Sequence, residues 1–216
     1  DLRAPLRSMS GYSDLLLEEY AEGLDETARL YLERIASSSQ FLDRLLLDLL
    51  AFGRAARLEI KLESVSVRQA WQSALMQCAA QIDQTQARIE SPEAAPWVRA
   101  HEATLSQALA NLLSNALKFV PAGVQPKIKL SAEARNGRVR LSLADNGIGI
   151  SADQHERIFR VFERLHGAGY AGTGIGLSIV RKGIERMGGM IGLTSAPGEG
   201  SCFWIELPQA SEAPED

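Results

Sequence analysis

The chain has 216 residues, of which 45% are hydrophobic and 23% are charged, and this composition is ordinary for a globular protein. Its net charge of −4 and its sequence pI near 5.5 argue against nucleic acid or an anionic membrane surface as the main partner. No apolar run approaches the ~20 residues that span a bilayer, and the first residues lack the apolar core of a signal peptide. The length allows one large domain or two small ones.

The two cysteines, Cys78 and Cys202, lie far apart and match no zinc or redox spacing. Buried free thiols are favoured over a disulfide, and free thiols fit a reducing compartment. We therefore expect a cytoplasmic location for this region, although a longer parent protein could carry a membrane segment.

The first expected element is an amphipathic helix within residues 1–20. Its apolar positions recur every three or four residues, at Leu2, Leu6, Met9, Tyr12 and Leu16. Pro5 falls inside this stripe, and a proline in a helix interior costs about 3 kcal/mol. Two alternatives follow. Either the helix begins at Leu2 or Arg3, where a first-turn proline is harmless, or it begins earlier and is bent.

A second, longer helix follows a short loop. Its seam alternates in steps of four and three residues, at Tyr31, Ile35, Ser38, Leu42, Leu45, Leu49 and Phe52. Gly23 is suited to end the first helix, and Asp25 is suited to cap the second. The two helices should form a hairpin that buries too little alone, so we expect a dimeric four-helix bundle. The alternative is that the hairpin packs onto the second domain of the same chain.

From about Ser64 the pattern changes to a mixture of helices and strands. Amphipathic helices are expected in VRQAWQSALMQCAAQI, ATLSQALANLLSNALKFV and GIGLSIVRKGIERMG. KIKLSAEA and GRVRLSLAD alternate in steps of two around a tight turn at 136–137, and MIGLTSA and SCFWIEL follow as strands. The fold class is therefore α+β, a helical hairpin followed by a two-layer sandwich. We expect domains at 1–60 and 61–209, a polar tail at 210–216, and a linker near 59–66.

Three stretches of the second region could carry chemistry, and the first is NLLSNALK at 111–118. Asn111, Asn115 and Lys118 fall within roughly 60° of one another on a helix, opposite an apolar stripe. They could form a solvated face, although asparagine is a poor helix former. Alternatively, they could present a carbonyl oxygen to hydrated Mg²⁺ and an ammonium group to phosphate.

The second stretch, LADNGIGI, places Asp145 at the end of a strand, before Gly147 and Gly149. Spaced glycines allow a close backbone approach, and the carboxylate could accept a hydrogen bond from an exocyclic amine such as that of adenine. A plain Asp-Asn-Gly turn is the alternative.

The third stretch, AGTGIGL at 171–177, opens a helix whose backbone N–H groups could bind an anion. A flexible glycine-rich linker is the alternative there.

In order, NLLSNALKF, DNGIG, IFRVFERL, GTGIGLS and GEGSCFWIELP resemble the N, G1, F, G2 and terminal-strand motifs of sensor histidine kinase ATP-binding domains. The hairpin before them resembles the dimerisation and phosphotransfer domain of that family. DLRAPLRSMSGY resembles its H-box, especially in phytochrome-like and related soluble sensors. The resemblance covers nearly the whole chain. It implies a sandwich of the gyrase, chaperone and histidine kinase ATPase type.

By this resemblance, ATP and Mg²⁺ are the expected cofactors. Asn115 would coordinate Mg²⁺, Asn111 would support that site, and Lys118 would lie near the phosphates. Asp145 would bind the adenine amine above a pocket floor shaped by Gly147 and Gly149. The remaining nucleotide-binding residues implied are Phe162 of the F motif and Gly172, Thr173, Gly174, Gly176 and Leu177 of the G2 motif.

The resemblance further implies transfer of the ATP γ-phosphoryl group to a histidine and then to an aspartate of a response-regulator receiver domain. The acceptor histidine directly precedes an acid, so it is expected just before Asp1, which would be its proton partner. The chain then starts inside a motif, as a truncated piece would. Ala4 replaces the Thr or Asn of many relatives, which predicts weak phosphatase activity.

Two other functions are compatible with the motifs. A nucleotide-binding pseudokinase would serve as a dimerisation scaffold without turnover, although intact motif residues argue against it. A gyrase-like ATPase would need a glutamate at position 111 to activate water, and Asn111 cannot take that proton. Phosphoryl transfer by positioning and electrostatics is therefore favoured over steady hydrolysis.

Overall fold

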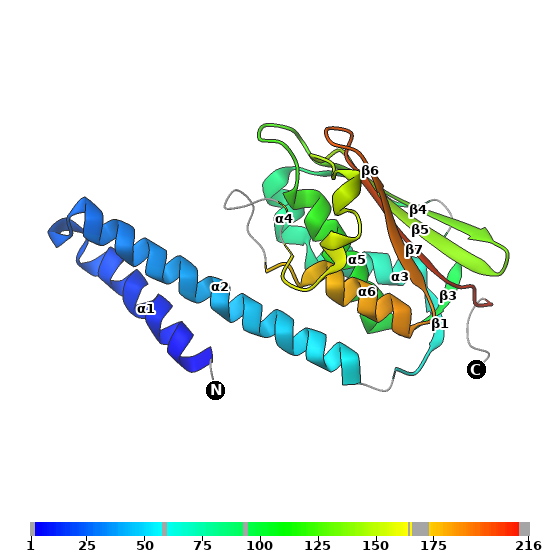
Figure 1. Ribbon diagram of the computed structural model, residues 1–216, viewed down its shortest axis with the longest axis horizontal. Coiled ribbons are helices and arrows are strands. Elements are labelled where there is room, and N and C mark those ends of the chain that lie inside the picture. Colours follow the sequence, from blue (N-terminus) through cyan, green and yellow to red (C-terminus); the bar gives the residue numbers. More distant parts are fainter. Residues whose placement is uncertain (1–2, 58–59, 93–94, 164, 166–172, 212–216) are drawn as a thin grey trace.

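The computed structural model describes residues 3–57, 60–92, 95–163, 165 and 173–211. They form a long helical hairpin followed by an α/β sandwich (Figure 1). This arrangement confirms the α+β class expected from the sequence. Among the described residues, no helix combines the length and the apolar character that crossing a membrane requires.

The hairpin consists of α1 (Arg3–Glu19), a 3-10 turn (Ala21–Gly23) and α2 (Glu26–Arg57). Pro5 lies in the first turn of the described part of α1, where it breaks no described hydrogen bond. Asp25 caps α2 as expected, because its Oδ1 accepts a hydrogen bond from the Ala28 amide at 2.6 Å. Near the other end of the hairpin, the Arg3 guanidinium contacts both carboxylate oxygens of Asp43, at 2.6 and 3.0 Å.

The sides of helix α2 differ in their contacts and in their exposure to solvent. Ala36 and Ser39 are buried in the hairpin, whereas much of the predicted seam is open, with Tyr31 57%, Leu42 45% and Leu49 44% exposed. Leu45 of the seam is half-buried, and the side chain of Phe52 is not described. Another part of α2 packs against α6 (Gly176–Arg186) of the sandwich. The two alternatives weighed for the hairpin therefore do not exclude each other, because α2 contacts its own chain and still leaves the seam uncovered.

The helical layer of the sandwich comprises α3 (Val67–Gln77), α4 (Ala79–Thr85), α5 (Glu102–Lys118) and α6. The sequence predicted one helix through Cys78, but the helix is interrupted there, at φ −101° and ψ 6°. Cys78 is buried, with its Sγ 3.6 Å from the Ala110 carbonyl oxygen of α5. The break allows both α3 and α4 to contact α5. Both cysteines are free, as predicted, but only Cys78 is buried, whereas Cys202 is half-buried.

The main sheet has the order β2-β4-β5-β7-β6. Its strands are β2 (Arg88–Glu90), β4 (Lys127–Arg135), β5 (Arg138–Asp145), β6 (Met190–Ser195) and β7 (Ser201–Pro208). Only the β2–β4 pair is parallel among these neighbours. Asn136 and Gly137, with φ of 51° and 70°, make the predicted tight turn between β4 and β5.

A second, two-stranded sheet pairs β1 (Glu63–Ser66) with β3 (Trp97–Ala100). The predicted linker at 59–66 is therefore too long, because Glu63–Ser66 pairs antiparallel with a strand more than 30 residues further along the chain. That partner has no strong alternation of its own, so the pairing was not visible in the sequence.

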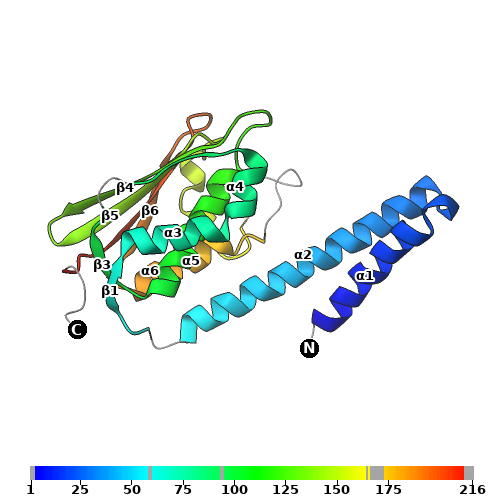
Figure 2. The same ribbon diagram turned by 180° about the vertical axis from the view of Figure 1, so that it is seen from behind.

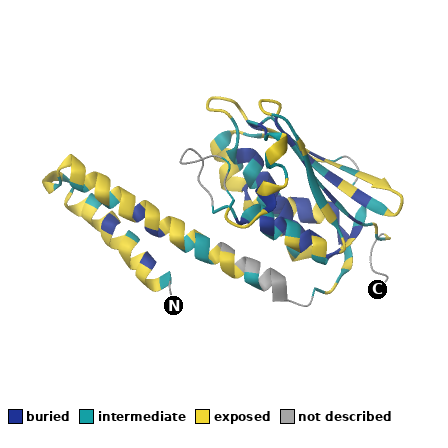
Figure 3. Cartoon of the chain, in the orientation of Figure 1, coloured by how far each residue is buried: buried dark blue, intermediate teal, exposed yellow. Residues whose placement is uncertain are grey.

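The core lies between the helices and one face of the main sheet. Alternate residues of the central strands, such as Leu141, Leu143 and Ile205, are almost fully buried against α5 and its neighbours. Figure 2 shows the helices gathered on this one side of the sheet. In Figure 3 the buried residues concentrate between the two layers, whereas the hairpin is mostly exposed. The core thus fixes the position of α5, which carries the NLLSNALK stretch.

Candidate functional site

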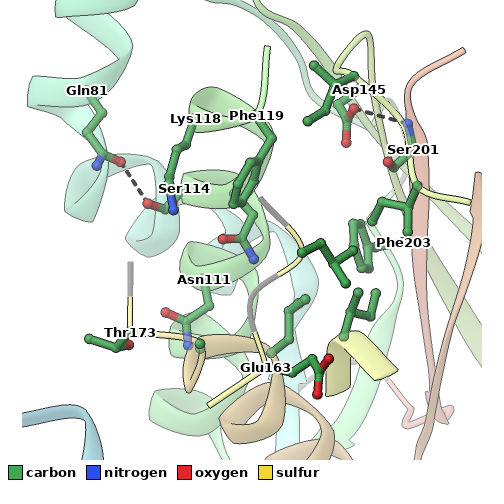
Figure 4. A pocket seen from close by; sticks show the side chains of 18 of the residues that line it. Gln81, Asn111, Ser114, Lys118, Phe119, Asp145, Glu163, Thr173, Ser201 and Phe203 are labelled. Atoms are coloured by element: carbon green, nitrogen blue, oxygen red, sulfur yellow. Dashed lines mark hydrogen bonds between the residues drawn. The ribbon is translucent and has the colours of Figure 1, made fainter. Parts of the chain in front are cut away.

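The predicted motif residues gather around one cavity of about 770 Å³. Its walls come from α5, the end of β5, the start of α6 and one side of α2. Figure 4 shows Asp145 and Ser201 on one side of this cavity, and Asn111 and Thr173 on the opposite side. Residues distant in sequence thus share a single space of the size that small-molecule ligands occupy.

Helix α5 supplies the polar wall. Asn111, Ser114, Asn115 and Lys118 all line the cavity because the opposite side of this helix is buried in the core. The Ser114 hydroxyl donates to Gln81 Oε1 at 3.0 Å, which ties α5 to α4 (Figure 4). The Lys118 ammonium lies 4.2 Å from the centre of the Phe119 ring. The polar residues of α5 are therefore a cavity wall rather than a solvated face.

Asp145 ends β5 and is half-buried. Its Oδ1 accepts hydrogen bonds from the Gly147 amide at 2.8 Å and from the Ser201 amide at 3.1 Å. Burial raises the pKa of this carboxyl, and the two backbone hydrogen bonds partly counter that rise. Both hydrogen bonds found among the described residues use Oδ1, which leaves Oδ2 as the oxygen without a hydrogen bond among those residues.

Glycines allow the backbone to close around Asp145. A Cβ on Gly147 would lie 2.4 Å from the Phe119 carbonyl oxygen, and one on Gly149, at φ +71°, would lie 1.9 Å from that of Ala196. Gly200, which sequence reasoning did not select, is equally constrained. Its φ is +78°, and a Cβ there would lie 2.0 Å from the Asp145 carbonyl oxygen.

The start of α6 forms another wall, lined by Thr173, Gly174, Gly176 and Leu177. Gly174 has φ +74°, and a Cβ there would lie 2.7 Å from the Glu163 carbonyl oxygen. Gly176 opens α6, so the first free N–H groups of an eleven-residue helix lie at the cavity. The predicted residues Asp1 and Gly172 lie outside the described part of the chain.

Phe162 is not part of the cavity lining. Its side chain is 55% exposed, although its amide donates to the Gly174 carbonyl oxygen at 3.0 Å. Through this hydrogen bond the backbone joins the F motif to the G2 motif. Phe159, three residues earlier, is buried in the core.

Several lining residues were missed by the sequence analysis, namely Ser37, Gln40, Phe41, Arg44, Gln81, Ser201 and Phe203. Ser201 lies within a quoted motif, GEGSCFWIELP, but nothing in that pattern marks its amide as the partner of Asp145. The residues of α2 lie outside every motif of the second region, so their presence at the cavity carried no sequence signal.

Two family models match this chain. The model described as histidine kinase-, DNA gyrase B- and HSP90-like ATPase matches residues 100–211, and the model of the His Kinase A phospho-acceptor domain matches residues 1–57. The chain belongs to the sensor histidine kinases. This histidine kinase core therefore contains an ATP-binding domain and a domain of the type through which histidine kinases dimerise, as the motif resemblance implied.

Curated relatives agree with this assignment. The chain is 35% identical over 209 residues to the phytochrome-like protein Cph1 of Synechocystis sp., covering 96% of this chain and 28% of that protein. It is also 35% identical over 220 residues to the sensor histidine kinase AruS of Pseudomonas aeruginosa. That match covers 97% of this chain and 22% of AruS. This histidine kinase core thus spans roughly a quarter of the length of these relatives.

Solved structures of the same family share its architecture. Full-length ShkA in complex with AMPPNP matches with a TM-score of 0.72 at 31% identity, covering 99% of this chain and 45% of that one. The Acinetobacter baumannii histidine kinase AdeS matches with a TM-score of 0.66 at 22% identity, covering 96% and 98% of the two chains. The second likeness is one of fold alone.

Proposed function

We propose that this chain transfers the γ-phosphoryl group of ATP to a histidine just before Asp1, from which it passes to an aspartate of a response-regulator receiver domain. The observation that carries this proposal is the convergence of the α5 polar residues, Asp145 and the start of α6 on one cavity. The two family models, which divide the chain between a phospho-acceptor domain and an ATPase domain, support it.

Asp145 would bind the adenine end of the nucleotide. Its Oδ1 is occupied by two backbone amides, which holds the carboxylate in one orientation. Oδ2 can then accept a hydrogen bond from the exocyclic amine of adenine. Gly147, Gly149 and Gly200 let the surrounding backbone approach closely enough to form the floor of this subsite.

The phosphates would lie between α5 and the start of α6. The Lys118 ammonium and the free N–H groups at the start of α6 both favour an anion there. Residues Thr173, Gly174, Gly176 and Leu177 would shape this subsite, and Gly172 would belong to it. Phe162 would contribute only through its backbone link to Gly174.

Asn115 would coordinate Mg²⁺, and Asn111, one turn earlier on the same cavity wall, would support that site. The described residues hold no group of three His, Cys, Asp or Glu side chains that could bind a metal alone. A Mg²⁺ ion would therefore rely on the Asn115 carbonyl oxygen, the nucleotide phosphates and water, as it commonly does in nucleotide sites. When bound, the ion neutralises charge on the transferring phosphoryl group. Asn111 cannot deprotonate water, so the site favours transfer over hydrolysis.

The proposal extends to partners and domain division. Residues 1–60 would form the dimerising phosphotransfer hairpin and residues 61–209 the catalytic domain, followed by a polar tail at 210–216. The partners would be a second copy of the chain and a receiver domain, with Asp1 as proton partner of the acceptor histidine. A cytoplasmic location is part of the same proposal.

The deciding experiment adds a single histidine before Asp1 and incubates the chain with ATP labelled at the γ-phosphate. We expect an acid-labile, alkali-stable label on the protein, lost in an Asn115→Ala variant. ATP binding without any such label would support the scaffold function instead. Release of labelled phosphate by the chain without added histidine would support a gyrase-like ATPase.

A further inference from the structure

Helix α2 of the hairpin forms part of the wall of the nucleotide cavity. Its lining residues are Ser37, Gln40, Phe41 and Arg44. At 100° per residue these four positions share one side of α2, within about 100° of one another. That side differs from the one bearing Ala36 and Ser39, which are buried in the hairpin, and from the open seam at Leu42. The third side of α2 therefore belongs to the site.

This wall lies toward the proposed phosphate end of the cavity. Helix α2 packs against α6, and the start of α6 lines the same cavity. In Figure 4 Thr173, just before α6, lies on the side of the pocket opposite Asp145. A nucleotide whose base is held at Asp145 would thus direct its phosphate tail toward α6 and α2.

Among the charged side chains around the cavity, Arg44 is the cation that α2 could offer to a phosphate group. Among the described residues, the charged ones that line the cavity are Arg44, Lys118, Asp145 and Glu163. Glu163 is paired with Arg157, and the Asp145 carboxylate is held by backbone amides. Arg44 is exposed and forms none of the ion pairs found among the described residues. An exposed guanidinium at the cavity wall is suited to binding a phosphate group.

The neighbouring polar groups of α2 are already used inside the hairpin. The Ser37 hydroxyl donates to the Arg34 carbonyl oxygen at 3.0 Å, and the Gln40 amide donates to the Ser10 hydroxyl at 3.3 Å. The Gln40–Ser10 contact ties α2 to α1, whereas the Ser37 hydrogen bond lies within α2. Among the described lining residues, Arg44 is the charged group that α2 presents to the cavity.

We propose that the Arg44 guanidinium binds the phosphate tail of the nucleotide while α2 is docked on the catalytic domain, so that the nucleotide bridges the two domains. The proposal rests on the ATP-binding function proposed above and adds to it a residue from outside the ATP-binding domain. Because binding and docking are linked, a nucleoside triphosphate stabilises the docked arrangement as much as docking strengthens triphosphate binding. A nucleoside, which has no phosphate, has no such effect.

The test compares ATP with adenosine on the 216-residue chain by calorimetry. In Arg44→Gln we expect ATP to bind about three- to tenfold more weakly, the range for a partly solvated charge-assisted contact. Adenosine should bind as it does to the unaltered chain. Arg34→Gln is the matched control, because Arg34 is exposed on the same helix but does not line the cavity, and it should change neither affinity. Arg44→Lys should recover part of the ATP affinity.

The outcomes separate the two proposals. Equal ATP affinity in Arg44→Gln and the unaltered chain overturns the role of Arg44 and leaves ATP binding intact. An equal loss for ATP and adenosine also overturns it, because Arg44 would then act on the shape of the cavity rather than on phosphate. An unaltered chain that binds neither ligand contradicts the proposed function itself, and the role of Arg44 falls with it.

Discussion

At the scale of single residues, ionised Asp145 costs folding free energy, and its proposed role is to accept a hydrogen bond from an adenine amine. Burial raises the pKa of this carboxyl, so the folded protein disfavours the ionised form, which is the stronger acceptor. The two amide hydrogen bonds to Oδ1 fix its orientation without using Oδ2. Stability and binding should therefore respond differently when the charge is removed.

The variant Asp145→Asn should lose ATP binding without losing stability at neutral pH. The Asn carbonyl oxygen can still accept from Gly147 and Ser201, but its amide group meets the adenine amine donor to donor. We expect ATP affinity to fall by about tenfold or more. Calorimetric titration with ATP measures this effect, and unchanged affinity would place adenine elsewhere.

The same variant should change the pH dependence of stability. Because the folded pKa of Asp145 lies above its ordinary value of 3.8, the folded protein binds this proton more tightly than the unfolded chain does. The stabilisation is thus present below 3.8 and is lost as the pH rises through the folded pKa. Asp145→Asn should lack that decline, so it should melt no lower than the unaltered protein at pH 7. A clearly lower melting temperature there would contradict the argument.

Gly200 and Gly198 form a matched pair for testing the backbone of the proposed adenine subsite. Both have φ near +80°, but an added Cβ meets nothing within 4 Å at Gly198 and lies 2.0 Å from the Asp145 carbonyl oxygen at Gly200. Gly198→Ala should cost about 1–2 kcal/mol, from its left-handed backbone alone. Gly200→Ala should cost clearly more and should weaken ATP binding. Equal unfolding free energies of the two variants in denaturant titrations would contradict this, because the backbone near Gly200 would then have shifted to accept the added Cβ.

Some residues of the site could be predicted from local sequence patterns, and others could not. Asn111, Lys118 and Asp145 were predictable because each stands in a spacing that places it at the end of a strand or on one side of a helix. Gly200 and Ser201 come near Asp145 only through the pairing of β5 with β7, in which Asp145 lies opposite Ser201. That register joins positions 56 residues apart, and no local pattern specifies it.

At the scale of elements, periodicity predicted the helices well wherever one side of the helix is apolar. It did not predict the interruption at Cys78, because the apolar pattern continues through it and the bend is set by contact with α5. Strands β1 and β3 are four residues each, too short for a clear alternation. Helix α2 is the most instructive case, since its cavity-lining side includes the polar residues Ser37, Gln40 and Arg44 and resembles a solvated surface in the sequence.

At the scale of the whole molecule, the hairpin exposes more apolar surface than its own contacts cover. The seam residues Tyr31, Ile35, Leu42 and Leu49 are 44–57% exposed, although α2 packs on both α1 and α6. Surface of this kind on an elongated hairpin favours association. The phospho-acceptor domain of this family implies a dimer, and the open seam is the place where a second copy would bind.

The variant Leu42→Glu should therefore dissociate the dimer while leaving the catalytic domain folded. Two copies of Leu42 would lose burial worth about 1.5 kcal/mol or more each, so the dissociation constant should rise on the order of 100-fold. Sedimentation equilibrium over a range of protein concentrations measures this change. Leu42→Met, which keeps the apolar surface, should remain dimeric. ATP binding should persist in both variants, because Leu42 does not line the cavity. A Leu42→Glu chain that dimerises as tightly as the unaltered one would place the interface on another side of the hairpin.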